Sequence, residues 1–237
     1  MLQGMKHVAA RAANAAEVPV YLFSTYHWAY LNKATLPWLD RMLVVSAILW
    51  GNAHRLMRSA VSEFLPGQRV LQAACVYGTF SRQLADQIGP SGHLEVVDVA
   101  TLQLDNTRRK LQDLAHVEVR QADLADAHCL AVEANDAVCC FFLLHEVPEN
   151  VRRRIVDNLL ASVRPGGKIV FTDYHRPHRW HPLRPVMALV FRYLEPFANS
   201  LFDASIESRS SRASEFSWHK TTCFGGLYQK VVGVRRP

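Results

Sequence analysis

The sequence predicts an α/β domain in which helices cover both faces of a mostly parallel sheet. Short β-branched or apolar runs alternate with amphipathic stretches from about residue 65 onward. This alternation is typical of parallel strands joined by crossover helices. The 237 residues suffice for one such domain with appendages, and 49% hydrophobic with 20% charged residues excludes coiled-coil, collagen-like and wholly disordered chains.

Five runs have the length and composition of buried strands. They cover residues 69–74, 93–97, 116–120, 137–144 and 168–172. Apolar side chains recur at helical spacing in residues 81–88, 101–114 and 150–163. Two further extended runs flank Gly225 and Gly226 within residues 216–235, and they predict an antiparallel pair that closes the sheet.

Helical segments precede and interrupt this pattern. Residues 18–63 are rich in aromatic side chains, and Pro37 is expected to separate two helices, because proline is tolerated only in a first turn. Another apolar helical stretch lies at about residues 177–205. We therefore expect a helical cap or lid over residues 1–64, and an α/β domain over 65–237 that carries a helical insertion.

Charge and cysteine content limit the possible partners. The net charge is +6, but the basic clusters lack the interleaved aromatic residues of a single-strand binder, so no nucleic-acid partner is expected. Five cysteines without CxxC spacing suggest neither a disulfide framework nor a zinc ribbon, and a reducing cytosol is the simplest setting. We expect no membrane span, because the apolar runs are shorter than the roughly 20 residues required.

The expected ligand site lies beyond the carboxyl ends of the strands. Asp98 ends the second strand, where a carboxylate can accept hydrogen bonds from both ribose hydroxyls of an adenosine. Asp123 follows the third strand, where it could contact an adenine amino group. A single aspartate at a strand end is often only a helix cap, so the ordered set carries the prediction.

The order of these motifs resembles that of class I S-adenosylmethionine-dependent methyltransferases. The segments that follow the fourth strand and precede the fifth, residues 144–148 and 164–168, resemble those of the quinone C-methyltransferases of ubiquinone and menaquinone synthesis. The resemblance covers about residues 65–175 and the C-terminal run. It implies a Rossmann-like, seven-stranded, mostly parallel sheet and S-adenosylmethionine as cofactor. The implied cofactor-binding residues are Ala74, Val76, Tyr77, Gly78, Asp98, Val99, Ala122, Asp123 and Leu124.

The turn after the first strand departs from that family. Where such methyltransferases carry an acidic residue and several glycines, this chain has Gln72, Ala74 and Val76, and only Gly78 remains. Glycine allows positive φ and a close approach of backbone to ligand. Either the cofactor is still bound, with its methionine end repositioned by Val76 and Tyr77, or the chain is a non-binding relative.

The altered turn on this body resembles the rhodoquinone biosynthesis proteins, the RquA family. That resemblance implies conversion of ubiquinone to rhodoquinone, in which an amino group replaces a ring methoxy group. It also implies S-adenosylmethionine as amino donor and a requirement for manganese. Two alternatives stay open: methyl transfer to a quinone or phenol, and a non-catalytic quinone-binding scaffold.

The remaining candidate residues follow from their places in this fold. His145, at the exit of the fourth strand, is the expected general base, and Tyr77 is grouped with it as a catalytic candidate. Asp173 and His175, after the fifth strand, are candidate Mn²⁺ ligands, because hard ions accept carboxylate and imidazole. Capping and loop hydrogen bonds are the alternative for these two residues. The candidate substrate contacts are Tyr30, Trp38 and Phe142, with ordinary core packing as the alternative.

The stretch 180–201 has a broad apolar face flanked by arginines. Such a helix lies in a membrane interface or packs on its own domain. Because ubiquinone, the expected substrate, lies in the bilayer, we expect peripheral association with the cytoplasmic face of the inner membrane, or a mitochondrial location in a eukaryote. The sequence leaves the oligomeric state open.

Overall fold

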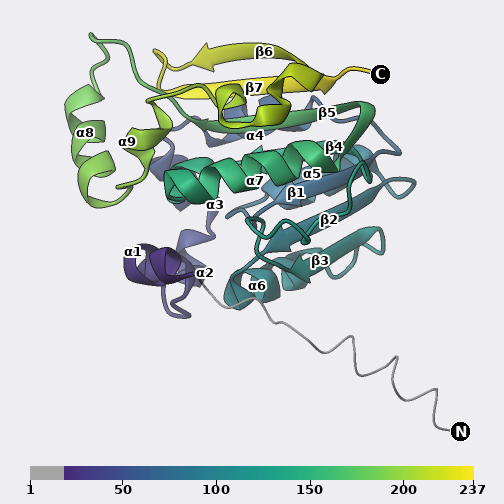
Figure 1. Ribbon diagram of the computed structural model, residues 1–237. Helices are drawn as coiled ribbons and strands as arrows, with labels where there is room; N and C mark the ends of the chain where they lie inside the picture. Colours follow the sequence, from purple (N-terminus) through teal and green to yellow (C-terminus); the bar gives the residue numbers. More distant parts are fainter. Residues whose placement is uncertain (1–18) are drawn as a thin grey trace, which may run out of the picture.

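The computed structural model describes residues 19–237, and the first 18 residues of the predicted cap lie outside the described part. A seven-stranded sheet runs in the order β3-β2-β1-β4-β5-β7-β6 (Figure 1). The strands are β1 (Arg69–Ala73), β2 (His93–Asp98), β3 (Val117–Gln121), β4 (Asn135–Phe141), β5 (Val163–Tyr174), β6 (Phe216–Cys223) and β7 (Tyr228–Arg235). The first five strands pair in parallel, and β7 is antiparallel to both its neighbours. The predicted sheet and its closing pair are confirmed.

Helices cover both faces of the sheet. In Figure 1, α7 (Glu149–Ser162) lies in front, whereas α4 (Ala53–Val61) and α5 (Phe80–Ile88) lie behind. Two apolar clusters fill the spaces between these layers, and residues of the central strands contribute to both because successive side chains point to opposite faces. The helix α6 (Thr101–Leu111) packs beside β2 and β3.

The lid consists of α1 (Val20–Tyr30), α2 (Leu36–Leu39) and α3 (Met42–Ile48). Pro37 lies in the first turn of α2, so it begins a short helix as predicted. The next helix, α4, belongs to the layer behind the sheet, since Leu56, Met57 and Ala60 are buried in the core. The predicted pair of cap helices is therefore a series of short helices, of which α1–α3 form the lid.

The insertion follows β5 and contains α8 (Arg184–Tyr193), α9 (Ala198–Leu201), and two 3-10 turns, η3 (Glu207–Arg209) and η4 (Ser211–Glu215). Another 3-10 turn, η2 (Leu144–Glu146), follows β4. Lid and insertion lie at the same end of the sheet (Figure 1). Within residues 19–237 the helices are too short or too polar for a transmembrane segment.

Candidate active site

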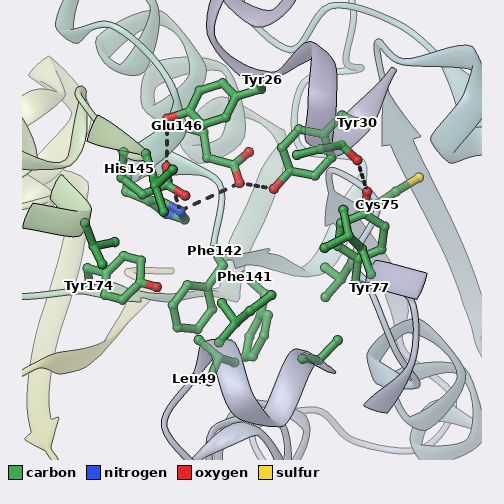
Figure 2. A pocket seen from close by; sticks show the side chains of 18 of the residues that line it. Tyr26, Tyr30, Leu49, Cys75, Tyr77, Phe141, Phe142, His145, Glu146 and Tyr174 are labelled. Carbon is green, nitrogen blue, oxygen red and sulfur yellow. Dashed lines mark hydrogen bonds and ion pairs between the residues drawn. The ribbon is translucent and has the colours of Figure 1, made fainter. Parts of the chain in front are cut away.

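A cavity of about 280 Å³ lies between the lid, the ends of the parallel strands and the insertion. Its wall is largely apolar, and seven aromatic residues contribute to it: Tyr26, Tyr30, Trp50, Tyr77, Phe141, Phe142 and Tyr174. Figure 2 labels six of them, all except Trp50. Its charged groups come from His145 and Glu146 of η2 and from Glu195, which follows α8. A mostly apolar pocket with a few converging polar groups is the usual form of a small-molecule site.

The loop after β1 is tied to β2 by Asp98. One carboxylate oxygen accepts the N–H of Cys75 at 2.7 Å, and the other accepts the N–H of Ala100 at 2.8 Å. Burial raises the pKa of Asp98, and these two hydrogen bonds counteract that effect. Ala74 has a φ of +69°, in the left-handed region that glycine adopts without strain. The chain thus keeps the backbone shape of a glycine turn with an alanine in it.

The far end of that loop is held by the lid. Asp40, between α2 and α3, accepts the N–H of Gly78 and the ammonium of Lys110, both at 2.8 Å. Lys110 also donates to the carbonyls of Val76 at 3.3 Å and Gly78 at 2.8 Å. Gly78 has a φ of +76°. The loop conformation therefore depends on the lid as well as on the sheet.

A buried acid–base cluster forms the polar wall of the cavity. His145 Nδ1 lies 2.8 Å from Asp173 Oδ1, and both side chains are at least 95% buried. The other ring nitrogen, Nε2, lies 3.7 Å from Glu146 and 3.8 Å from Glu195. Asp173 also accepts the N–H groups of Leu144 at 2.9 Å and His145 at 3.3 Å. One imidazole thus contacts carboxylates from three segments of the chain.

This arrangement changes the protonation of the cluster. Burial lowers the pKa of His145, but Asp173 and then Glu195 outweigh burial and raise it to about 9. Burial raises the pKa of Glu146 to about 8, although His145 opposes this shift. Burial also raises the pKa of Glu195. These shifts favour a cationic His145 and a protonated Glu146 at neutral pH.

Two tyrosines of α1 complete the cluster. Tyr30 donates to Glu146, and Tyr26 donates to Glu195 at 2.8 Å. The ring of Tyr30 stacks on Tyr77, with centroids 5.6 Å apart and planes 11° from parallel. In Figure 2, Tyr30 reaches Glu146 from the opposite side of the carboxylate to His145. The lid therefore donates a hydrogen bond to each carboxylate that faces His145.

The comparisons with known proteins agree with this fold. Residues 70–167 match the family model of a methyltransferase domain. This segment is therefore similar to methyltransferase domains. The chain is 22% identical over 186 residues to a demethylmenaquinone methyltransferase of Bacillus cytotoxicus, covering 76% of this chain and 73% of that relative. It is 28% identical over 153 residues to the ubiquinone/menaquinone biosynthesis C-methyltransferase UbiE of Ectopseudomonas mendocina. That match covers 62% of this chain and 57% of UbiE.

Solved structures share the architecture of the methyltransferase domain. An O-methyltransferase family protein from Burkholderia thailandensis matches 99% of this chain and 68% of its own, with a TM-score of 0.66 and 14% identity. The N-methyltransferase NodS of Bradyrhizobium japonicum, in complex with S-adenosylhomocysteine, matches 92% and 100%, with a TM-score of 0.59 and 13% identity. At this identity the likeness shows the fold alone, and the predicted Rossmann-like class I methyltransferase fold is confirmed.

The predicted nucleoside residues lie beside the cavity, under α1. Leu22 and Tyr26 of α1 form an apolar cluster with Ala100, and Val99 packs against it. Asp123 accepts the N–H of Ala125 at 2.8 Å and so caps its own turn. Of the predicted cofactor residues, only Val76 and Tyr77 line the cavity. The helix α1 therefore packs against the residues that follow Asp98 at the end of β2.

Two of the three predicted substrate contacts line the cavity. Tyr30 and Phe142 are in the wall, and the Phe142 ring meets His145 edge to face at 5.9 Å. The contact of Trp38 with substrate stays a prediction, since Trp38 is not in the wall and is 58% exposed. The reason is helical geometry, because Leu36 and Leu39 on the other face of α2 take the buried positions.

The predicted manganese pair does not converge. Asp173 binds His145, whereas His175 Nδ1 lies 2.9 Å from the carbonyl of Gly226. The two residues part because β5 ends at Tyr174, after which the backbone of His175 bonds Leu227. Over residues 19–237, no three histidine, cysteine or acidic side chains are grouped so that they could hold a metal ion.

The carboxylate of Glu195 and the hydroxyl of Tyr26 were not predicted as site groups. Glu195 is the only acidic residue between positions 180 and 201, and an isolated acid in an apolar stretch was the available signal. Tyr26 had no such signal among the many aromatic residues of the lid. Glu146 lies inside the segment 144–148 that resembles the quinone methyltransferases, but that resemblance predicted a role only for its neighbour His145.

Proposed function

We propose that this chain is an S-adenosylmethionine-dependent transferase that acts on the ring of a quinone or quinol. The observation that carries the proposal is the buried His145, held by Asp173, at the wall of an aromatic cavity. A quinone is a flat apolar ring with oxygen atoms at its edge. Aromatic walls suit the ring, and the buried polar groups suit its oxygens.

The residues fit a sulfonium cofactor. The acidic residues of the cavity wall are Glu146 and Glu195, and the ionised member of this pair attracts a cation. Aromatic faces such as those of Tyr30 and Tyr77 also attract a cation. Gln72 Oε1, buried at the base of the loop after β1, has no hydrogen-bond partner among the residues that the structure describes. That acceptor suits an ammonium group. When bound, S-adenosylmethionine supplies the group that is transferred.

The protonation of the cluster assigns a role to each residue. Carbon methylation of a quinol requires loss of a hydroxyl proton, which leaves negative charge on a ring oxygen. His145 donates Nε2–H to that oxygen and stabilises the charge, and Asp173 holds the imidazole in the required tautomer. The ionised member of the Glu146 and Glu195 pair accepts the proton. The predicted role of His145 as a base is thus replaced by that of a cationic donor.

The similarity to a demethylmenaquinone methyltransferase and to UbiE supports methyl transfer to a quinone precursor as the first candidate. The test is incubation with S-adenosylmethionine labelled in its methyl group, followed by mass spectrometry of extracted quinones. Incorporation of the label into a demethylated quinol is expected. A protein that binds S-adenosylmethionine in calorimetry but labels neither quinols nor phenols would be a scaffold.

Amino transfer to ubiquinone is the second candidate, and one observation favours it. Val76 and Tyr77 project into the cavity from the loop where related enzymes carry glycines, so the methionine end of the cofactor meets different groups. Addition of an amine beside a quinone carbonyl also places negative charge on a ring oxygen, which His145 stabilises in the same way. Incubation with S-adenosylmethionine that is labelled at its amino nitrogen distinguishes the two candidates. Label in a product that has lost one methoxy group would identify rhodoquinone.

We further propose that the cavity opens toward a membrane surface. Ile48, Trp50 and Leu194 line the cavity and are 50%, 37% and 47% exposed. Half of the predicted apolar stripe packs inward through Met187 and Phe191. Other members of the stripe are exposed, together with flanking arginines: Trp180, Val186, Leu194, Arg179, Arg184 and Arg192. A bilayer lying on this rim would let a prenyl tail stay in lipid while the ring enters.

Vesicle flotation tests this membrane proposal. Binding to anionic vesicles at low salt is expected to weaken at high salt, because each exposed arginine contributes about 1 kcal/mol near such a surface. The double variant Arg179→Glu, Arg184→Glu should lose binding, whereas Arg108→Glu on α6 is the control. If the wild-type protein does not bind vesicles at low salt, the apolar stripe has a purely structural role. Binding in this test would support peripheral association with a membrane surface.

A further inference from the structure

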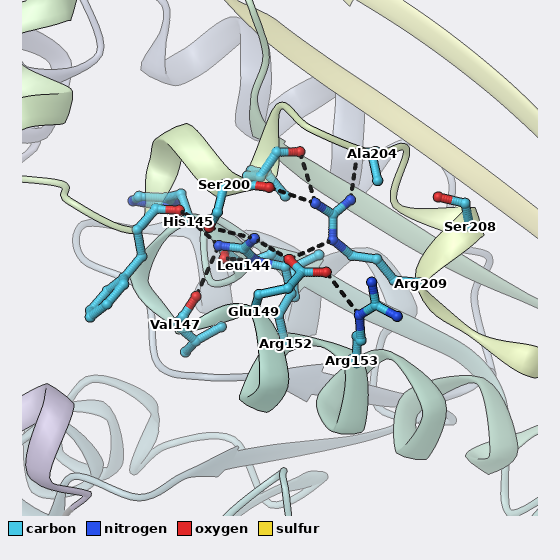
Figure 3. Close-up of polar contacts among 12 residues, drawn as sticks. Leu144, His145, Val147, Glu149, Arg152, Arg153, Ser200, Ala204, Ser208 and Arg209 are labelled. Carbon is cyan, nitrogen blue, oxygen red and sulfur yellow. Dashed lines mark hydrogen bonds and ion pairs between the residues drawn. The ribbon is translucent and has the colours of Figure 1, made fainter.

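Arg152 is a fully buried cation on α7, and it contacts the η2 turn that carries His145 and Glu146. Its Nε donates to the carbonyl of Leu144 at 2.7 Å, and one terminal nitrogen donates to Val147 at 2.9 Å and Phe197 at 2.8 Å. The other terminal nitrogen contacts Glu149 at 2.7 Å and Ser200 at 3.1 Å. Figure 3 shows these contacts converging on one guanidinium. All five N–H donors of the arginine therefore have a partner.

These partners bracket the acid–base residues. Leu144 and Val147 flank His145 and Glu146, and Phe197 lies two residues after Glu195. On the other side of the turn, the Asp173 carboxylate accepts the N–H groups of Leu144 and His145. The turn η2 is thus held between an anion that takes its N–H groups and a cation that takes its carbonyls.

We propose that Arg152 is a positioning residue, which fixes the η2 turn and the Glu195 segment so that His145 and Glu195 face each other. The effect of Arg152 on catalysis rests on the proposed function. Its effect on the pKa of His145 does not. The insertion carries Glu195, and Arg152 joins it to the methyltransferase domain. Docking of the insertion and placement of the catalytic imidazole are therefore one event.

Lysine cannot replace this arginine. An ammonium has three donors and no planar fork, so it leaves buried carbonyls unpaired. Arg209 extends the same network, since it bonds Glu149 at 3.2 Å and the carbonyls of Ser200 and Ala204. Arg153 also binds Glu149, at 3.0 Å, but its side chain is 59% exposed and bonds nothing in the turn. Arg153 is therefore a matched control on the same helix.

The sign of one measurement separates positioning from charge. The groups that face His145 are Asp173 and Tyr174 from β5, Phe142 and Glu146 from its own segment, and Glu195 from the insertion. Tyr26 and Tyr30 of α1 reach it through the two carboxylates. Loss of a nearby cation raises the pKa of an imidazole. Loss of the carboxylate geometry lowers it.

The experiment is an NMR titration of the His145 imidazole in the full-length protein without substrate. The resonance is assigned with His145→Gln, and the variants are Arg152→Lys, Arg152→Met and Arg153→Met. We expect both Arg152 variants to weaken proton binding at His145 about tenfold or more, and Arg153→Met to leave it unchanged. A raised or unchanged pKa in Arg152→Met would overturn the proposal.

Two additions keep the result decisive. If the Arg152 variants do not fold, Ser200→Ala removes one acceptor of the guanidinium and a donor to Phe197, and it should lower the same pKa to a smaller extent. In a Glu195→Gln background the effect of Arg152→Lys should shrink, because part of it acts through Glu195. An effect of undiminished size contradicts the coupling. Kinetics form a separate readout, in which the Arg152 variants should lower kcat and keep the KM for S-adenosylmethionine. The NMR titration does not require activity, so it tests the role of Arg152 even if the protein does not act on quinones.

Discussion

Replacement of Asp173 by asparagine removes the charge that sets the protonation of His145. The carboxylate accepts the N–H groups of Leu144, His145 and Tyr174 in addition to the imidazole Nδ1. The single amide oxygen of asparagine cannot accept all of these hydrogen bonds. The NH₂ group of asparagine would face N–H donors, with which it cannot form hydrogen bonds. Breaking a buried pair of this kind costs about 3–5 kcal/mol. Asp173→Asn should destabilise the protein by that amount at pH 6.

The loss should depend on pH with a defined sign. The folded pKa of His145 is raised to about 9, whereas an unperturbed histidine has a pKa of 6.5. The stability from this pair is therefore fully present below pH 6.5 and is lost as pH rises through about 9. At about 1.36 kcal/mol per pH unit over that interval, its size is about 3 kcal/mol. The effect of Asp173→Asn should therefore be about 3 kcal/mol smaller at pH 10 than at pH 6.

Urea unfolding of wild type and Asp173→Asn at pH 6, 8 and 10 measures this difference. Glu146 also titrates, at about pH 8, but its ionisation affects both proteins. His145→Gln is the control, since without the imidazole the Asp173 substitution should lose this pH dependence. A destabilisation of equal size at all three pH values would refute the assignment of His145 as a buried cation.

Glu195→Gln should lower the pKa of His145 and reduce the transfer rate about 10²-fold, the size expected for a proton acceptor, and a pH–rate profile would detect both effects. Ala74→Gly should raise the free energy of unfolding by about 1 kcal/mol, because Ala74 has a positive φ that glycine adopts without strain. A urea titration that shows no gain in this free energy would contradict the claim that Ala74 is strained. Gly78→Ala should destabilise by about 1–2 kcal/mol. Its Cβ would lie 2.5 Å from the Met42 sulfur, and Met42→Ala should not rescue it fully, since the φ of +76° remains.

Local patterns were enough to predict the sheet. Strand and helix periodicity depends on neighbours within a few residues, and so the five parallel strands and the closing pair could be read from residues 69–235. Parallel strands end at one edge, and therefore the positions of Asp98 and His145 at that edge also followed from the sequence. The side on which a helix buries its residues was less certain, as Trp38 shows.

Only the tertiary structure decided which groups meet at the site. Glu195 and Tyr26 are separated by 169 residues, yet they share a hydrogen bond beside His145. Asp173 turned to the imidazole and left His175, because two residues near a strand end acquire partners from different elements. The sequence determined the sheet and the edge where the site lies. The cation at His145 came from carboxylates that only folding gathers in a buried space, where charges interact strongly.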